Sequence, residues 1–322
     1  MDLSLLFHNF FAPPVPFFFV GLFAVIAKSD LEIPNQISKF ISLYLLMAIG
    51  FKGGVELHHS GLNTEVIVVI VFAMLMAVAV PLYSFYLLRV KLDVANAAAL
   101  AAAYGSVSAV TFITASSLLA EQGISYGGEM VAAMALMESP SIIIGVWLYR
   151  KYSASQDHHL DMKELFREAF LNGSIVVLLG SLVIGLISND KGMEVMQPFT
   201  GGIFKGMLAF FLLDMGVVAG KRIDALKEAG WKLVAFGVIM PFINAMIGIG
   251  ISYLIGLSPG NAFMFTILCA SASYIAVPAA MRIAIPEANP GIYVPMALAV
   301  TFPFNIMVGL PVYYYIIEQF IK

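Results

Sequence analysis

The stretch Leu92-Asp-Val-Ala-Asn-Ala97 is followed, ten residues after its asparagine, by Ser106-Val-Ser108. The same pattern returns 165 residues later, where Leu257-Ser-Pro-Gly-Asn-Ala262 is followed at the same distance by Ser271-Ala-Ser273. A half-length repeat that carries paired serines inside an apolar chain is typical of secondary transporters, which bind substrate and coupling ion near the bilayer midplane, where the two halves meet. The repeat therefore predicts a transport protein.

The composition indicates that this chain folds in lipid. Apolar residues make up 61% of the 322 residues, charged residues make up 11%, and the mean hydropathy is +0.93. An ordinary soluble domain contains roughly 25% charged residues. Ten stretches are long and apolar enough to cross ~30 Å of hydrocarbon as helices. These predicted spans are 10–27, 34–54, 66–88, 94–120, 129–149, 170–187, 198–219, 232–256, 260–284 and 292–317.

Further landmarks repeat between the halves, each of which holds five predicted spans. Gly50-x-x-x-Gly54 is matched by Gly216-x-x-x-Gly220, and these glycines are expected to allow close helix contact. Because an odd number of crossings reverses direction, the second half inserts upside down relative to the first. We therefore predict an all-α polytopic membrane protein of ten transmembrane helices in two inverted five-helix repeats, residues 1–152 and 169–322, joined by a cytoplasmic linker, 153–168. The alternative is chance similarity between apolar helices.

The distribution of basic residues predicts the orientation. If the connections after spans 1, 3, 5, 7 and 9 are cytoplasmic, they and their flanking helix ends hold 13 of the 17 Lys and Arg residues. This asymmetry predicts that both termini lie outside a bacterial inner (plasma) membrane. In the linker, Asp161-Met-Lys-Glu164 matches a helix capping box and predicts a short amphipathic helix that leads into span 6. The linker is either a mere connector or a regulatory docking site. No basic residue precedes the first apolar run, so we expect no signal peptide.

Several classes of function are excluded. A single cysteine, Cys269, rules out an internal disulfide and a multi-thiolate metal site. A net charge of −3 offers no basic platform, so we expect no nucleic acid partner. Gly220-Lys221 lacks the flanking residues of a nucleotide-binding loop. We expect a protein that is not an enzyme and that is driven by an ion gradient instead of ATP.

The polar residues inside spans 4 and 9 mark the candidate site. Span 4 contains Tyr104-Gly-Ser-Val-Ser-Ala-Val-Thr111, and span 9 contains Ser271-Ala-Ser-Tyr-Ile-Ala-Val-Pro278. We expect both helices to break at the midplane, because Gly105 relaxes the backbone and Pro278 has no N–H to donate. The free N–H groups of each following half-helix attract a small oxyanion, while unwound carbonyls and hydroxyls bind Na⁺. The alternative is that these hydroxyls bond back to their own helices.

Two carboxylates lie within the predicted spans. Glu138 is near the centre of span 5, a depth at which a carboxylate is costly and normally serves a cation pathway or a buried network. It is a candidate Na⁺ ligand or a neighbour of one; the alternative is a protonated structural glutamate. Asp214 lies nearer a helix end, where a helix-end or inter-helix hydrogen bond accounts for it. A rival function, sodium/proton exchange, would use Glu138 as the titrating group.

The polar motifs resemble those of the cyanobacterial-type sodium-dependent bicarbonate transporter family. The resemblance covers essentially the whole chain and rests on residues 104–112, 121–126, 135–140 and 270–282. It implies a mobile core domain and a gate domain in an elevator-type homotrimer, with bicarbonate between the two broken helices. It also implies a PII-like cytoplasmic regulator. The linker 153–168 is short beside the long central loop of regulated members, which leaves this partner open.

The resemblance also implies which residues form the site. The substrate-binding candidates are Gly105, Ser106, Ser108, Ser271, Ser273 and Tyr274. The Na⁺ candidates are Ser106, Thr111, Glu138 and Ser271. We expect a symporter, surrounded by membrane lipid, that imports bicarbonate with Na⁺ as the coupling ion. The residues alone leave open a different small carboxylate anion as the substrate.

Overall fold

The computed structural model describes residues 14–61, 63–153, 162–223 and 230–321, and every regular element in these ranges is a helix. The predicted all-helical class is confirmed. Among the described residues, seven helices are long and apolar enough to cross a membrane. The number is eight if the pair Lys163–Leu171 and Gly173–Ser188, bent by 46°, forms one span. Two shorter apolar helices, Pro16–Ile26 and Pro259–Ala270, accompany them.

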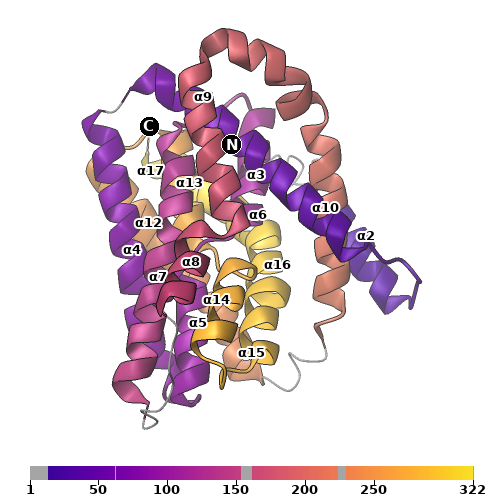
Figure 1. The fold of residues 1–322 in the computed structure, drawn as a ribbon, viewed down its shortest axis with the longest axis vertical. Helices are drawn as coiled ribbons and strands as arrows, with labels where there is room; N and C mark the ends of the chain where they lie inside the picture. Colours follow the sequence, from indigo (N-terminus) through magenta and orange to yellow (C-terminus); the bar gives the residue numbers. More distant parts are fainter. Residues whose placement is uncertain (1–13, 62, 154–161, 224–229, 322) are drawn as a thin grey trace.

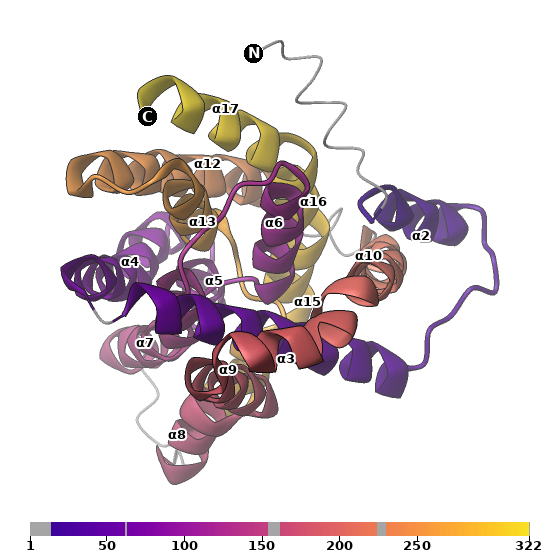
Figure 2. The ribbon, with the colours of Figure 1, turned by 90° about the horizontal axis from the view of Figure 1, so that it is seen from above.

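Four helices pack together in what we call the four-helix group: α2 (Pro16–Ile26), α3 (Asn35–Ser60), α9 (Gly173–Gln197) and α10 (Phe204–Gly220). Within it, α3 packs along α9, and α10 packs along α2 (Figure 2). A Cβ on Gly54 would lie 2.0 Å from the carbonyl oxygen of Leu182, and one on Gly216 would lie equally close to the backbone of α2. The prediction of close contact at these glycines is therefore confirmed. The hydroxyl of Ser38 donates to Asp214, which accounts for that carboxylate by a hydrogen bond between helices.

Most of the other helices form a second assembly, which we call the larger group (Figure 1). Here α4 (Thr64–Leu88) packs on α7 (Glu129–Tyr152), and α12 (Trp231–Ile255) packs on α13 (Pro259–Ala270). Two interrupted helices run through this group. The first consists of α5 (Val94–Gly105) and α6 (Ala109–Glu121), and the second consists of α13 and α14 (Ala276–Ala284). The alanines that fill α5 are buried, because small side chains let neighbouring helices approach closely.

The last helical segment of the chain contains two wide turns. It runs through α15 (Pro290–Pro295), the π-helix η2 (Met296–Thr301), α16 (Phe302–Phe304), the π-helix η3 (Asn305–Gly309) and α17 (Leu310–Phe320). Prolines recur along this segment, and a proline has no backbone N–H to donate. The π-turns accommodate the backbone hydrogen bonds that are lost. Thr301 and Asn305 are buried in these turns. Thr301 donates to the carbonyl of Gly237 at 2.8 Å, and the Asn305 amide donates to the carbonyl of Ala270 at 2.9 Å. The segment is thereby tied to the end of α13.

The connections beside α9 differ from the prediction. Residues 188–197, which the sequence assigns to the connection between spans 6 and 7, continue α9, because no proline interrupts it before the π-helix η1 (Pro198–Gly202). Span 6 also begins differently, since Asn172 caps α9 and separates it from α8 (Met162–Leu171). The predicted amphipathic helix of the linker is therefore present as α8. Its predicted cap, Asp161, and residues 10–13 of span 1 lie outside the described residues.

Candidate functional site

The first helix interruption lies between α5 and α6. α5 ends at Gly105, where an added Cβ would lie 2.2 Å from Cγ of Pro81 on α4, so only glycine fits this contact. Ser106 has an extended backbone (φ −93°, ψ −178°), which stops the helix. Ser108 then caps α6, because its Oγ accepts hydrogen bonds from the N–H of Thr111 at 3.1 Å and from the Thr111 hydroxyl at 2.9 Å. The predicted break in span 4 is confirmed.

The second interruption lies between α13 and α14. Ser271 is extended (φ −89°, ψ 167°), and the helix resumes at Ala276. Pro278 lies in the first turn of α14, where the missing N–H would have no helical partner in any case. The Oγ of Ser273 accepts the N–H of Val277 at 3.3 Å. The predicted break in span 9 is therefore confirmed, and its proline starts the second half-helix.

The two interruptions are hydrogen-bonded to each other at what we call the crossing. The N–H of Ser108 donates to Oγ of Ser271 at 3.0 Å, and the N–H of Ser273 donates to the carbonyl of Ala103 at 2.8 Å. Each break thus satisfies a buried group of the other. Leaving one such group unpaired would cost ~1–3 kcal/mol. The crossing is therefore a mutually supported element.

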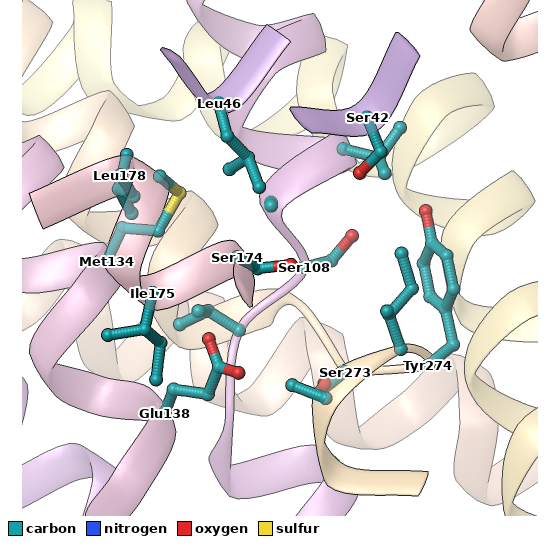
Figure 3. A pocket seen from close by; sticks show the side chains of 15 residues that line it. Ser42, Leu46, Ser108, Met134, Glu138, Ser174, Ile175, Leu178, Ser273 and Tyr274 are labelled. Carbon is teal, nitrogen blue, oxygen red and sulfur yellow. The ribbon is translucent and has the colours of Figure 1, made fainter. Parts of the chain in front are cut away.

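A pocket of about 40 Å³ lies beside the crossing, between the two helix groups. Figure 3 shows Ser108, Ser273 and Tyr274 around it, with Ser42 of α3 and Glu138 of α7 facing the same space. Among the described residues that line it, none is basic and Glu138 is the one charged residue. Because a cavity needs roughly 10–15 Å³ to hold one water, the space suits about three water-sized bodies or one small oxyanion.

The structure divides the predicted site residues into two sets. Those that line the pocket are Ser108, Ser273, Tyr274 and Glu138. Those that do not line it are Gly105, Ser106, Thr111 and Ser271. Thr111 and Ser271 instead hydrogen-bond to Ser108. The buried hydroxyl of Ser106 has no hydrogen-bond partner within the described part of the chain.

Sequence reasoning missed two polar residues of the pocket, Ser42 of α3 and Ser174 of α9. Both belong to the four-helix group, so they approach the crossing from the opposite side. Neither stands in a repeated motif. A single serine in an apolar helix normally bonds to its own backbone, so the sequence carries no signal that separates these two from others.

Glu138 is held where three helices meet. Its Oε1 accepts a hydrogen bond from the amide of Asn172 at 3.2 Å, and the same asparagine caps α9 through the N–H of Ile175 at 3.0 Å. The adjacent Ser139 hydroxyl donates to the carbonyl of Ala169 in α8 at 2.5 Å. The carboxylate is thus fixed at the pocket. If it is ionised, an anion in the same pocket needs a compensating cation.

These features define a multi-pass helical membrane protein with a polar pocket at the crossing of two interrupted helices. The family model of the Na⁺-dependent bicarbonate transporter superfamily matches residues 13–318. The chain belongs to this superfamily, which confirms the predicted resemblance. Membership in a transporter family implies that the protein is not an enzyme. No curated protein matches the sequence.

Proposed function

We propose that the protein is a Na⁺-coupled symporter that imports bicarbonate, which binds in the pocket at the crossing. One observation carries the proposal: the pocket is lined by the first turns of α6 and α14 and by Ser108 and Ser273, without a basic side chain. The family match supports Na⁺ as the coupling ion and bicarbonate as the substrate.

Helix N-termini supply the positive potential for the anion. The first N–H groups of a helix have no partner inside it, and this end carries roughly half a positive charge. Ala109 and Val110 of α6 and Ala276 of α14 line the pocket. Two such ends at one small space favour an anion, and the hydroxyls of Ser108 and Ser273 add polar contacts. The small volume supports bicarbonate over larger carboxylates.

Glu138 makes a coupled cation necessary. Two like charges 4 Å apart repel by ~4 kcal/mol at an effective dielectric constant of about 20, so an ionised Glu138 opposes a bound anion. Na⁺ removes this repulsion. We assign it to oxygen ligands, as expected for a hard cation. Glu138 is assigned from the pocket, and the hydroxyls of Ser106, Thr111 and Ser271, which do not line the pocket, are assigned from the adjoining crossing. The unpartnered hydroxyl of Ser106 supports a ligand at the crossing.

The proposal includes ten membrane crossings in two inverted repeats. Adding α2 and the α13–α14 pair to the eight spans counted above gives ten. Reciprocal contacts support the inversion. Asn96 of α5 accepts the N–H of Asn289, ahead of α15, at 2.7 Å. Asn261 of α13, 165 residues after Asn96, accepts the N–H of Gly127, ahead of α7, also at 2.7 Å. Such exchange is what inverted repeats produce.

We further propose an elevator-type motion, which the position of the pocket between the two helix groups supports. The larger group carries both interruptions and corresponds to the core domain, while the four-helix group corresponds to the gate domain. We also propose a homotrimer in a bacterial inner membrane with both termini outside. The linker 153–168 is either a connector or the docking site of a PII-like regulator. The homotrimer and the regulator rest on the family resemblance. The orientation rests on the distribution of Lys and Arg residues along the sequence.

Transport by purified protein in vesicles tests the proposal. Labelled bicarbonate should accumulate in proteoliposomes when Na⁺ is present outside, and replacement of Na⁺ by K⁺ should abolish the accumulation. Ser273→Ala should reduce uptake while the protein stays folded. Excess formate or acetate tests whether the substrate is a different carboxylate. If it is, these anions should reduce the uptake of labelled bicarbonate by competition. Equal uptake in K⁺ would remove Na⁺ from the mechanism.

Sodium/proton exchange is the second candidate, and the position of Glu138 in the pocket favours it. An exchanger would change the internal pH of vesicles when Na⁺ is added in bicarbonate-free buffer, and Glu138→Gln would abolish the change. The proposed symporter produces no such change. A pH-sensitive dye inside the vesicles therefore separates the two functions.

A further inference from the structure

An apolar groove runs between α7 and α8, away from the pocket. Its first part has a volume of about 200 Å³ and is lined by residues that include Ile143, Trp147, Arg150, Leu165 and Phe166. Ile143 also lines a second cavity of about 310 Å³, whose other lining residues are Phe170, apolar residues of α4, α7 and α9, and the polar Ser139. We call the two parts together the α7–α8 groove.

The α7–α8 groove is apolar along its length and cationic at one end. Arg150 is the one charged residue in its lining and lies in the last turn of α7. The neighbouring Lys151 lies with Nζ 4.7 Å from the ring centre of Trp147. Ala135 and Arg150, the limits of the lining along α7, are fifteen residues or about 22 Å apart. This exceeds the roughly 15 Å of hydrocarbon in one leaflet.

The exposed rings of α8 indicate contact with a membrane interface. Phe166 and Phe170 stack with ring centres 5.8 Å apart, and their exposed fractions are 49% and 44%. Lys163 and Arg167 lie on the same short helix. The spacing of three and four residues places Lys163 and Arg167 on the same face of α8 as the two rings. Exposed aromatic rings beside basic side chains are typical of segments at a membrane interface.

We propose that the α7–α8 groove binds an anionic phospholipid, with an acyl chain along α7 and the phosphate at the Arg150 guanidinium. The charge complementarity selects this occupant. A guanidinium binds phosphate oxygens through two parallel hydrogen bonds, and a zwitterionic lipid gains less there because its own ammonium competes. An apolar trough with a single cationic end matches an amphiphile with an anionic head.

Occupancy of the groove is linked to the transport pocket through α8. The Ser139 hydroxyl binds the carbonyl of Ala169 at the wall of the groove, and Asn172 at the end of α8 binds Glu138. α8 also packs on α14, whose first turn lines the pocket. A lipid that fixes α8 therefore stabilises the pocket. This consequence rests on the proposed function, whereas lipid binding itself does not.

The chain's two tryptophans allow a direct test, because Trp147 lines the groove and Trp231 lies at the start of α12. The full-length Trp231→Phe protein, in detergent micelles, is titrated with phosphatidylglycerol or phosphatidylcholine brominated on the acyl chains. Bromine quenches tryptophan fluorescence on contact. We expect phosphatidylglycerol to quench Trp147 with the lower half-saturation. Arg150→Gln should raise that value about fivefold, the factor for ~1 kcal/mol per basic residue at an anionic lipid.

Controls separate this site from general lipid contact. In the Trp147→Phe protein, Trp231 reports general lipid contact, and Arg150→Gln should leave its quenching by both lipids unchanged. Lys232→Gln, which removes a cation 5.8 Å from the Trp231 ring, should leave the quenching of Trp147 unchanged. If Arg150→Gln does not fold, the preference of the Trp231→Phe protein is instead measured in rising KCl, which should reduce it. Equal quenching of Trp147 by both lipids, or no effect of Arg150→Gln or of salt, would overturn the proposal. The proposal would also be overturned if neither lipid quenched Trp147 because a second copy of the chain covered the α7–α8 groove.

Discussion

Ser108→Ala is the most direct test of the site, because one hydroxyl both caps α6 and lines the pocket. Loss of a helix N-cap costs ~1 kcal/mol of folding stability. Loss of a hydrogen bond to a charged ligand costs ~1.5–3 kcal/mol, which corresponds to a roughly 10- to 150-fold weaker affinity. We therefore expect Ser108→Ala to fold with slightly reduced stability and to bind bicarbonate at least about tenfold more weakly. The KM for uptake and the thermal stabilisation by bicarbonate with Na⁺ measure these quantities.

Two further variants separate capping from binding. Asn63 caps α4 through the N–H of Val66 at 3.0 Å and does not line the pocket. Asn63→Ala should lose a similar stability and keep its affinity. Ser108→Thr retains the hydroxyl and should recover most of the affinity. An unchanged KM in Ser108→Ala, or an equal rise in Asn63→Ala, would refute the assignment of this hydroxyl to the anion.

Three other predictions concern packing and motion. Gly54→Ala should destabilise the protein by ~1–3 kcal/mol, because its Cβ would lie 2.0 Å from a carbonyl oxygen of α9. Gly180→Ala, with no atom within 4 Å of the new Cβ, should stabilise it by up to ~1 kcal/mol, and thermal unfolding compares the two. Ser271→Ala should lower the free energy of unfolding by ~1–3 kcal/mol, because it leaves the buried N–H of Ser108 without a partner. An unchanged unfolding temperature would contradict this. Glu121 and Lys205 form an ion pair at 3.0 Å between the two helix groups. Cysteines engineered at these two positions and joined by a reducible thiol-specific cross-linker should block uptake without preventing bicarbonate binding, and a reductant should restore uptake. Full uptake while cross-linked would exclude relative motion there.

The helix breaks were predictable because polar residues stand at repeated positions in lipid-spanning sequence. Gly105 marks its break by a contact that tolerates no Cβ, and Pro278 marks the start of the second half-helix, where a missing N–H costs nothing. The clustering of Ser108 and Ser273 follows from the same pattern, whereas Glu138 stood out as a carboxylate near the centre of a predicted span. Gly50 and Gly54 predicted that α3 packs closely on another helix. The sequence did not identify that helix as α9.

Other features depend on tertiary packing and carry no local signal. Ser42 and Ser174 reach the pocket only because α3 and α9 lie against the crossing. The hydrogen bond from Ser108 to Ser271 joins positions 163 residues apart, and no spacing rule predicts it. The continuation of α9 through residues 188–197 was also missed, because polar residues there suggested a connection while the backbone keeps its helical bonds.

The hydrogen bonds between the two interruptions bear on which parts of the protein determine anion selectivity and which determine the transport rate. In the proposed elevator motion, these bonds keep Ser108 and Ser273 together, so both serines would accompany the solute to either face of the membrane, whereas Ser42 and Ser174 belong to the other helix group. Substitutions of side chains at the crossing should then change the preference for one anion over another. Changes in turnover should arise from the sliding surfaces that α3 and α9 present. Selectivity and speed are thereby assigned to separate parts of the chain and can vary independently.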